Sequence, residues 1–298
     1  MSAREFTILI GMCAVWGFHF VVIKLAVAEA PPIFYAALRM TLVAALTAPF
    51  LRWRRGEMGR VLVAGACLGG FNYALMFSGV RYAGAAESAV AIELYAPFAT
   101  ILSMIFLKEH VGWRRGTGIA IAFVGVGVIA LGGGAQEETS SRLGVALVTM
   151  GAFSEAVGAI LVKQTKGFRP HELLAWFSLI GSAALWPTTL LVETGQGAAW
   201  ASADKPLLIG AIFYSALGAS VFGHSAYYWL LQRLPVSQVA PSALLTTFFA
   251  VICGVVFLRE PTGPTFIAGG ALTMFGVGVV LIRGASPKRD AVVAEPPQ

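Results

Sequence analysis

The strongest constraint on this chain is its division into ten apolar stretches, each about as long as a lipid bilayer is thick. A helix needs ~20 predominantly apolar residues to cross the hydrocarbon core, which is about 30 Å thick. Short polar or Gly- and Pro-containing turns separate the stretches, so each would form its own crossing. They cover approximately residues 6–24, 31–51, 58–80, 86–107, 113–133, 142–162, 171–193, 205–230, 237–258 and 264–284. We therefore expect an all-α integral membrane protein with ten transmembrane helices.

The composition supports this assignment and excludes several other classes. Hydrophobic residues make up 57% of the chain and charged residues 12%, whereas soluble domains carry about 25% charged residues. The three cysteines, Cys13, Cys67 and Cys253, all lie inside apolar stretches and form no metal-binding pair. The sequence also lacks the phosphate-binding pattern GxxxxGK[ST]. We expect no disulfide framework, no metal and no other cofactor.

Lysine and arginine residues are unevenly divided between the two sides of the expected membrane. With a cytoplasmic N-terminus, the cytoplasmic connections carry 15 of the 21 cations and the outer connections carry 5, while Arg39 lies within a stretch. This positive-inside bias predicts that both termini are cytoplasmic, in a multi-pass protein of the inner membrane. The formal charge of +6 is spread over these loops. It does not form the single basic face that a nucleic-acid partner requires.

The second half of the chain repeats the first. With a shift of 151 residues, F-L-K-E at 106–109 falls on F-L-R-E at 257–260, and G-V-G-V at 125–128 falls on G-V-G-V at 276–279. A shift of 139 residues aligns the earlier stretches of each half. We place the two repeats at 1–134 and 142–284, followed by a flexible cytoplasmic tail at 285–298.

Each repeat contains five stretches, an odd number, so the second repeat must cross the membrane in the opposite sense to the first. Inverted repeats are the architecture of many secondary transporters, since two similar halves can exchange conformations and turn a central cavity from one side to the other. A duplication that serves only as a scaffold is the alternative. The first stretch also imitates a cleaved signal peptide, but the repeat uses residues 16–31, so we expect it to be retained.

Motifs along the chain resemble those of the EamA-type transporters of the drug/metabolite transporter superfamily. W-G-F-H-F-V-V-I-K at 16–24, followed by Pro31 and Arg39, looks like the first-helix signature of that family. Y-A-L-M-F-S-G-V-R-Y-A at 73–83, Pro97 and the two F-L-[KR]-E endings are similar to later marks. The resemblance covers essentially the whole membrane part. It implies a ten-helix exporter of amino acids, other metabolites or toxic cations, and not an enzyme.

The chain departs from the family pattern in its ninth stretch. A proline that matches Pro97 is usual there, and here that position is Phe248, with Pro241 seven residues earlier. Proline bends a helix because it removes a backbone hydrogen bond. We therefore expect bending points at Pro97 and at the pair Gly69 and Gly70, and a displaced kink in the ninth helix.

Ionisable residues inside the hydrocarbon are costly, and they usually line a cavity or form pairs. Arg39 lies 8 residues past Pro31, ~12 Å below the outer surface, and Glu93 lies 7 residues into the fourth stretch, ~10 Å below it. These depths predict an Arg39–Glu93 pair. The pair either only fixes helix packing or lets Glu93 exchange Arg39 for a substrate ammonium or a proton; alternatively, the two side chains reach separate polar surroundings. Glu155, in the sixth stretch, is a further candidate proton site.

Aromatic and polar residues occupy mid-depth positions that correspond in the two halves and should face one axis. Together they would form an aromatic cavity with a few polar groups, the usual chemistry of a small-molecule site. Alternatively, such aromatics only pack the helices or anchor them at the interface. The candidate substrate contacts are Trp16, His19, Tyr73, Tyr95, His224, Tyr228 and Thr246.

An aromatic cavity suits aromatic or other apolar amino acids, and also organic cations, which aromatic faces attract. The first fit resembles the aromatic amino-acid exporter branch of the family, the YddG-like proteins. Proton-coupled and uncoupled export are both compatible with the sequence.

Two alternatives concern catalysis and assembly. Ser220 and His224 lie four residues apart on one expected helix, so their side chains can touch, as an intramembrane serine hydrolase would require. An unbroken helix, however, offers no oxyanion donors. We expect a monomer, with a homodimer through the glycine-rich fifth and tenth stretches as the alternative.

Overall fold

The protein is a bundle of helices in every part that the structure describes. This computed structural model describes residues 2–106, 112–131, 138–201, 204–231 and 242–284. The first half contains α1 (Ala3–Glu29), α2 (Pro32–Thr47), η1 (Ala48–Phe50), α3 (Met58–Gly65), η2 (Ala66–Phe71), α4 (Asn72–Tyr82), α5 (Ala85–Ile92), α6 (Tyr95–Phe106) and α7 (Trp113–Leu131). The second half contains α8 (Glu138–Gln164), α9 (Pro170–Val192), α10 (Gln196–Ala201), α11 (Lys205–Phe213), η3 (Tyr214–Gly223), α12 (His224–Leu231), α14 (Ser242–Leu258) and α15 (Pro264–Gly284).

These elements account for the ten expected membrane spans. Seven helices are long and apolar enough to cross a membrane, and three shorter apolar helices correspond to the fifth, ninth and tenth stretches. The third span consists of α3, η2 and α4, the fourth of α5 and α6, and the eighth of α11, η3 and α12. The fold class is therefore that of an all-α, multi-pass membrane protein.

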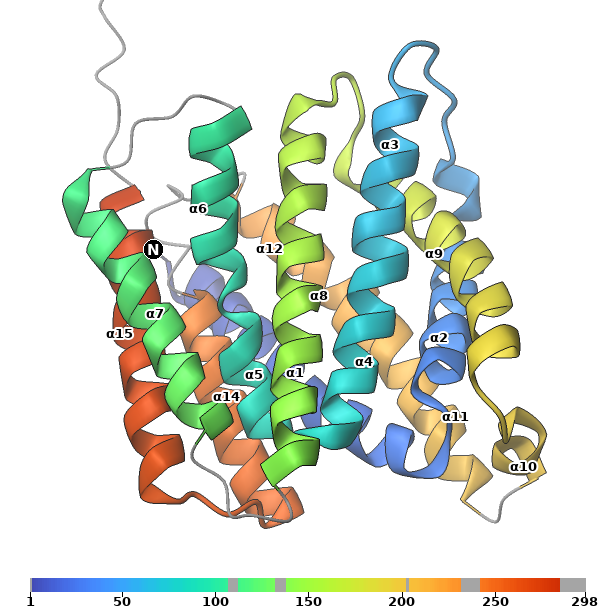
Figure 1. Ribbon diagram of the computed structural model, residues 1–298. Coiled ribbons are helices and arrows are strands. Elements are labelled where there is room, and N and C mark those ends of the chain that lie inside the picture. Colours follow the sequence, from blue (N-terminus) through green and yellow to red (C-terminus); the bar gives the residue numbers. More distant parts are fainter. Residues whose placement is uncertain (1, 107–111, 132–137, 202–203, 232–241, 285–298) are drawn as a thin grey trace, which may run out of the picture.

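Successive spans run in alternating directions through the bundle (Figure 1). As a result α1 and α8, the first spans of the two halves, run in opposite senses, as halves of five crossings require. The four most extensive helix contacts, α7–α15, α4–α8, α2–α9 and α1–α14, all join one half to the other. The two halves are thus interleaved and do not lie side by side as separate bodies.

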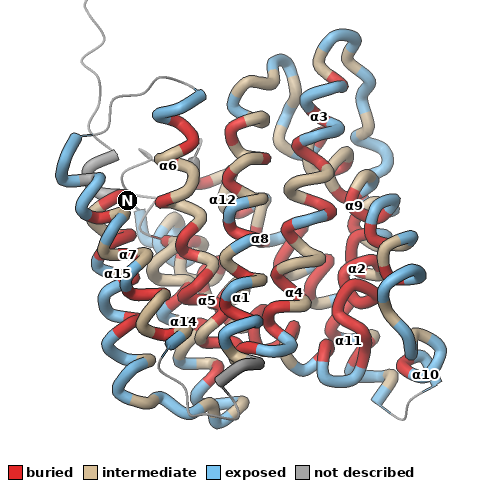
Figure 2. Tube along the Cα trace, in the orientation of Figure 1, coloured by how far each residue is buried: buried red, intermediate tan, exposed pale blue. Residues whose placement is uncertain are grey.

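Burial in the bundle follows the pattern of a protein surrounded by lipid. Figure 2 shows buried residues toward the middle of the bundle and exposed residues on its outer faces. Large apolar side chains are among the exposed ones: Leu191 is 84% exposed, and Phe71 and Phe257 are more than 60% exposed. Water would disfavour such a surface, whereas hydrocarbon accepts it.

The third and eighth spans contain matching irregular segments of π-helix. When η2 is shifted by 151 residues, it falls within η3. A π-helical segment adds a residue to the turn and weakens the regular hydrogen-bond ladder, and such segments often occur at functional sites. The predicted bending residues Gly69 and Gly70 both lie in η2 and are buried. A Cβ on Gly69 would collide with the carbonyl oxygen of Phe177 on α9, so this glycine permits a close helix approach.

At one end of the bundle, two charged side chains cap the helix termini at the turn between the third and fourth spans. Lys24 donates from Nζ to the carbonyl oxygens of Val80 (2.9 Å) and Ala83 (2.5 Å), near the end of α4. Glu260 accepts hydrogen bonds from the backbone N–H groups of Ala85 (2.5 Å) and Ala86 (2.9 Å), at the start of α5. Helix termini leave these backbone groups without intrahelical partners. We call this region the Lys24 end. The F-L-R-E ending of the second half therefore caps a helix of the first half, while Leu107, Lys108 and Glu109 of F-L-K-E lie outside the described residues.

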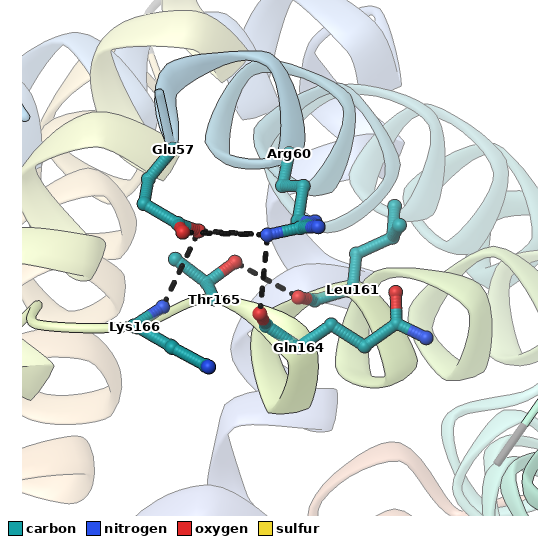
Figure 3. Close-up of polar contacts among 6 residues, drawn as sticks. All are labelled: Glu57, Arg60, Leu161, Gln164, Thr165 and Lys166. Atoms are coloured by element: carbon teal, nitrogen blue, oxygen red, sulfur yellow. Dashed lines mark hydrogen bonds and ion pairs between the residues drawn. The ribbon is translucent and has the colours of Figure 1, made fainter. Parts of the chain in front are cut away.

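The opposite end, which we call the Arg60 end, holds the described salt bridges. Arg60 Nη1 lies 3.1 Å from Glu57 Oε2 and donates to the carbonyl oxygen of Gln164 at 3.5 Å, while the backbone N–H of Lys166 donates to Glu57 at 3.4 Å (Figure 3). Nearby, a second salt bridge joins Arg54 and Glu172. These contacts connect the turn after η1 with the turn after α8, again one half with the other.

The fifth and tenth spans, α7 and α15, pack closely through glycines. A Cβ on Gly125 would meet the backbone nitrogen of Thr273 at 2.5 Å and the carbonyl oxygen of Gly269 at 2.6 Å. A Cβ on Gly127, two residues later, would meet nothing within 4 Å. Part of the glycine-rich surface is thus used within the chain. A homodimer through the remainder stays a prediction.

We expect Gly125→Leu to destabilise the protein far more than Gly127→Leu, because only the first substitution drives a side chain into the backbone of α15. Overpacking of this kind costs typically about 1–3 kcal/mol, occasionally more. The measurement is the melting temperature and monodispersity of each purified variant in detergent. Equal melting temperatures for the two leucine variants would contradict the α7–α15 packing.

We also expect Glu260→Gln to lower the stability of the protein by about 1–2 kcal/mol, since an amide presents one uncharged oxygen to the two N–H groups of α5, where the carboxylate presents two charged ones. The matched control is Glu29→Gln, which removes an exposed carboxylate at the same end of the bundle. Both melting temperatures are compared with that of the unmodified protein. A Glu260→Gln variant as stable as the control would show that the cap contributes nothing.

Candidate functional site

Arg39 of α2 lies in the interior of the bundle, with its charge facing aromatic rings. Its side chain is among the most buried, with 2% exposure. Nη2 donates to Ser220 Oγ in η3 at 2.9 Å, and the guanidinium carbon lies 4.4 Å from the ring centroid of Tyr73 and 5.7 Å from that of Phe77. Nε and Nη1 are buried and have no hydrogen-bond partner. This guanidinium therefore keeps unused donors.

The predicted Arg39–Glu93 ion pair is wrong. Thr247 of α14 donates to Glu93 Oε1 at 2.6 Å, whereas Arg39 bonds to Ser220. Equal depth in the membrane does not fix the direction in which a side chain points around the bundle. The most extensive contacts of α2 are with α9 and α4, whereas those of α5, which ends just before Glu93, are with α14 and α8. Both side chains are buried, so neither has reached a polar surface.

Glu93 lies where the fourth span is interrupted. Pro97 has no N–H to donate to the carbonyl oxygen of Glu93 four residues before it, and Ala96 donates to that oxygen instead at 3.2 Å. The helix consequently stops at Ile92 and begins again at Tyr95, two residues before the proline. The gating roles of Pro97 and of the glycines in η2 stay predictions.

Glu155 of α8 occupies the other side of this region. Asn72 donates from Nδ2 to Glu155 Oε2 at 3.2 Å and to the carbonyl oxygen of Gly151 at 3.0 Å. Glu155 and Glu93 are close enough to interact electrostatically. Among the described residues, salt bridges occur only at the Arg60 end, so both carboxylates are held by neutral donors.

The eighth span is tied to the first half by a network around Ser215 of η3. His19 Nε2 lies 2.9 Å from Ser215 Oγ, and the Tyr35 hydroxyl also bonds to that oxygen. Tyr35 donates further to the carbonyl oxygen of Ala211 at 3.2 Å, and Trp16 Nε1 donates to that of Ala219 at 2.8 Å. Side chains of α1 and α2 thus satisfy groups in and beside the irregular segment η3.

Four of the predicted substrate contacts lie together, on α1, α4 and α12. Trp16 packs edge-on against His224 with ring centroids 5.6 Å apart. His19 and Tyr73 both contact Phe77, at 6.3 and 5.5 Å between centroids. His19 is only 7% exposed and is hydrogen-bonded to Ser215, so in this conformation it packs the helices together.

The other predicted contacts are placed differently. Tyr95, at the start of α6, packs against two groups of buried apolar residues, one containing Leu94 and Val126 and the other Leu102 and Ile160. Thr246 is the neighbour of Thr247 on α14, and it is Thr247 whose hydroxyl reaches Glu93. Thr246 Oγ1 is buried without a hydrogen-bond partner. The side chain of Tyr228 lies outside the described residues.

Sequence reasoning missed several residues of this region. Asn72 was visible as an amide in an apolar stretch, a signal that could have been used. Serines are too common in membrane helices to be noticed without the fold, and Tyr35 lies so near Pro31 that it reads as an interface anchor. The missed residues are Tyr35, Asn72, Phe77, Ser215 and Thr247. Ser220 was considered only as a nucleophile, and its contact with Arg39 was not expected.

The contact required for a Ser220–His224 hydrolase is not formed. The hydroxyl of Ser220 donates to the carbonyl oxygen of Ser215 at 3.1 Å and accepts from Arg39. His224 Nδ1 meets the backbone carbonyl oxygen of Ser220 at 3.0 Å, not its hydroxyl. The hydroxyl of Ser220 is engaged by the Ser215 carbonyl and by Arg39, so it does not point to the His224 ring.

Two hollows lie away from the predicted contacts. One, of about 410 Å³, is an apolar groove on the flank between η2, α4, α6 and α8, lined by Phe71, Phe98 and Phe153 among others. The second, of about 340 Å³, lies at the Lys24 end beside Glu29 and Arg81. No residue of the predicted substrate set lines either one.

Comparison with known proteins assigns the chain to a family. The sequence matches the EamA-like transporter family over residues 4–131 and again over 142–282. An uncharacterized transporter of Archaeoglobus fulgidus is 26% identical over 274 residues, covering 89% of this chain and 94% of that protein. A probable amino-acid metabolite efflux pump of Salmonella typhimurium is 25% identical over 301 residues, covering 99% of this chain and 100% of that protein.

A crystal structure of one protein has the same fold, with a TM-score of 0.59 at 19% sequence identity, over 96% of this chain and 100% of that one. At this identity the likeness concerns the fold alone. The family match, by contrast, covers nearly the whole chain in two segments. The protein is therefore a multi-pass membrane transporter that belongs to the EamA-like transporter family.

Proposed function

We propose that this transporter exports amino acids with aromatic or other apolar side chains. The observation that carries the proposal is the aromatic cluster around Arg39, where Trp16, Tyr73 and Phe77 surround a few polar groups in the interior of the bundle. Aromatic walls with few fixed charges suit an apolar side chain. The name of the Salmonella typhimurium relative, a probable amino-acid metabolite efflux pump, supports the same class.

Alternating access fits the contacts at the two ends of the bundle. The Lys24 end is held by Lys24 and Glu260, and the Arg60 end by Glu57 and Arg60. In each cycle one set would open while the other stays closed. The irregular segments η2 and η3 and the interruption at Glu93 are the places where the spans can bend.

The charge bias of the loops gives the orientation that we propose. The Arg60 end also holds Arg54 and Lys166, so the positive-inside rule places it in the cytoplasm together with both termini. We propose a monomer in the inner membrane that works with a small-molecule substrate and no nucleic acid.

A second candidate substrate class is the organic cations. Glu93 and Glu155 lie near each other and are held by neutral donors, Thr247 and Asn72. Two carboxylates in the membrane interior favour a bound cation or a proton. This arrangement supports either a cationic substrate or a proton that moves in exchange for the substrate.

The test is a substrate screen with purified protein in proteoliposomes. We expect saturable flux of labelled phenylalanine that is accelerated by unlabelled phenylalanine on the opposite side, because a carrier exchanges substrate across the membrane. Tryptophan, tyrosine, methionine, threonine and a quaternary ammonium ion are compared, with and without a pH gradient. Protein-free liposomes provide the control.

The screen separates the candidates. Flux of the quaternary ion without any amino acid would replace the amino-acid proposal by the organic-cation one. Flux without saturation or exchange would indicate a channel and would contradict alternating access. A dependence on the pH gradient would identify proton coupling.

A further inference from the structure

We propose that Arg39 is the site that binds the carboxylate group of the transported molecule. This inference rests on the proposed function and adds to it the group of the substrate that is recognised. In the conformation seen here Tyr73 covers the guanidinium, and we infer that the substrate carboxylate binds when that ring moves away.

The first argument is the unbalanced charge of Arg39. Arginine keeps its positive charge inside proteins, and such a charge in the hydrocarbon is expensive unless it is paired. Arg54 and Arg60, at the Arg60 end, each form a salt bridge with a glutamate. The described contacts of Arg39 are instead a neutral hydroxyl and two rings. Cation–π contacts compensate only part of the lost hydration.

The second argument is the set of unused donors. A guanidinium has five N–H groups, and the described partner of Arg39 is Ser220, which takes one of the two on Nη2. Nε and Nη1 are buried and unpartnered. The second N–H of Nη2 lies parallel to an N–H of either Nε or Nη1, depending on which hydrogen bonds to Ser220. In both cases these two N–H groups form a two-donor fork. Such a fork matches the two oxygens of a carboxylate.

The third argument is that the surroundings hold the guanidinium in place. Ser220 donates its own hydrogen to the carbonyl oxygen of Ser215, and so it offers a lone pair to Arg39. Ser215 in turn is bonded to His19 and Tyr35. A binding group that is oriented by second contacts loses little freedom when its ligand arrives. The network therefore orients Arg39 and leaves its remaining fork for a ligand.

Access to the fork depends on Tyr73. The ring of Phe77 is fully buried, whereas Tyr73 is partly exposed and lies at the start of α4, directly after η2. A change in the irregular segment η2 would move Tyr73 off the guanidinium. Binding of the carboxylate would then be linked to the bending of the third span, which is what a transport cycle requires.

Recognition of a carboxylate decides between the two candidate substrate classes. A quaternary ammonium ion without an acid group would be repelled by Arg39, whereas an amino acid would use it. An amino acid whose carboxyl is converted to an amide should likewise lose this contact.

The experiment compares L-phenylalanine with L-phenylalaninamide in proteoliposomes of the unmodified protein and of Arg39→Gln, Arg39→Lys and Arg55→Gln. Arg55 is an exposed arginine near the Arg60 end and serves as the matched control. We expect a KM for the acid at least tenfold below that for the amide in the unmodified protein. Arg39→Gln should raise the KM of the acid about 10- to 100-fold, as expected when a charged hydrogen-bond partner is lost, and should abolish the preference. Arg39→Lys should lie between, and Arg55→Gln should change nothing.

Two results would overturn the proposal. One is an Arg39→Gln variant that is folded, with a melting temperature close to that of the unmodified protein, and keeps its KM for phenylalanine. The other is an unmodified protein that treats acid and amide alike, and this result is decisive even if no Arg39 variant folds.

A binding measurement separates this inference from the proposed function. The probe is 3-phenylpropionate, a carboxylate without an amino group, and the readout is the melting temperature of purified protein. Stabilisation of the unmodified protein but not of Arg39→Gln, with a smaller effect on Arg39→Lys, supports the carboxylate site even if the flux screen finds no amino acid. Flux of amino acids without any stabilisation by this acid, and without preference over the amide, retains the function and rejects the role of Arg39.

Discussion

The interior of a bilayer offers no water to backbone polar groups, and this constraint underlies the whole structure. It makes every span a helix and allows irregular backbone only where protein surrounds it. In the π-helical segments η2 and η3, side chains from the other half of the chain donate hydrogen bonds to backbone carbonyl oxygens. Ser154 donates to the carbonyl oxygen of Cys67 in η2 at 2.9 Å, and Trp16 donates to that of Ala219 in η3 at 2.8 Å. Each half therefore donates a hydrogen bond to the irregular span of the other, from positions that differ by one residue in the repeat alignment.

The same constraint applies more severely to charges. Arg39, Glu93 and Glu155 are kept in the interior, although a direct pair between Arg39 and either acid would remove much of the cost. The fold instead holds the cation against aromatic rings and Ser220, and the acids against Thr247 and Asn72. Charges that are held apart inside a membrane favour binding, since a molecule with the complementary charge forms the ion pair that is not made within the protein.

The sequence predicted the number of spans, the fold class and the family, because these depend on the length and order of apolar stretches and on motifs visible along the chain. It placed Trp16, His19, Tyr73 and His224 near one another correctly, since the repeat relates their depths. It failed for Arg39 and Glu93, because depth does not determine which way a side chain points around a helix. The π-helical turns were equally hidden, because no sequence motif marks them. The contacts that hold the Ser220 hydroxyl, with Arg39 and the Ser215 carbonyl, also depend on packing between spans.

The unequal fourth and ninth spans have a consequence for the resting protein. The fourth is interrupted at Glu93 and Leu94, whereas α14 continues from Ser242 to Leu258 through the corresponding positions. Two halves with identical joints would have the same energy facing either compartment. In the alternating-access cycle proposed above, one half would bend at this interruption and the other would have to deform a continuous helix. Without a substrate gradient, the protein should thus spend more time open to one compartment than to the other.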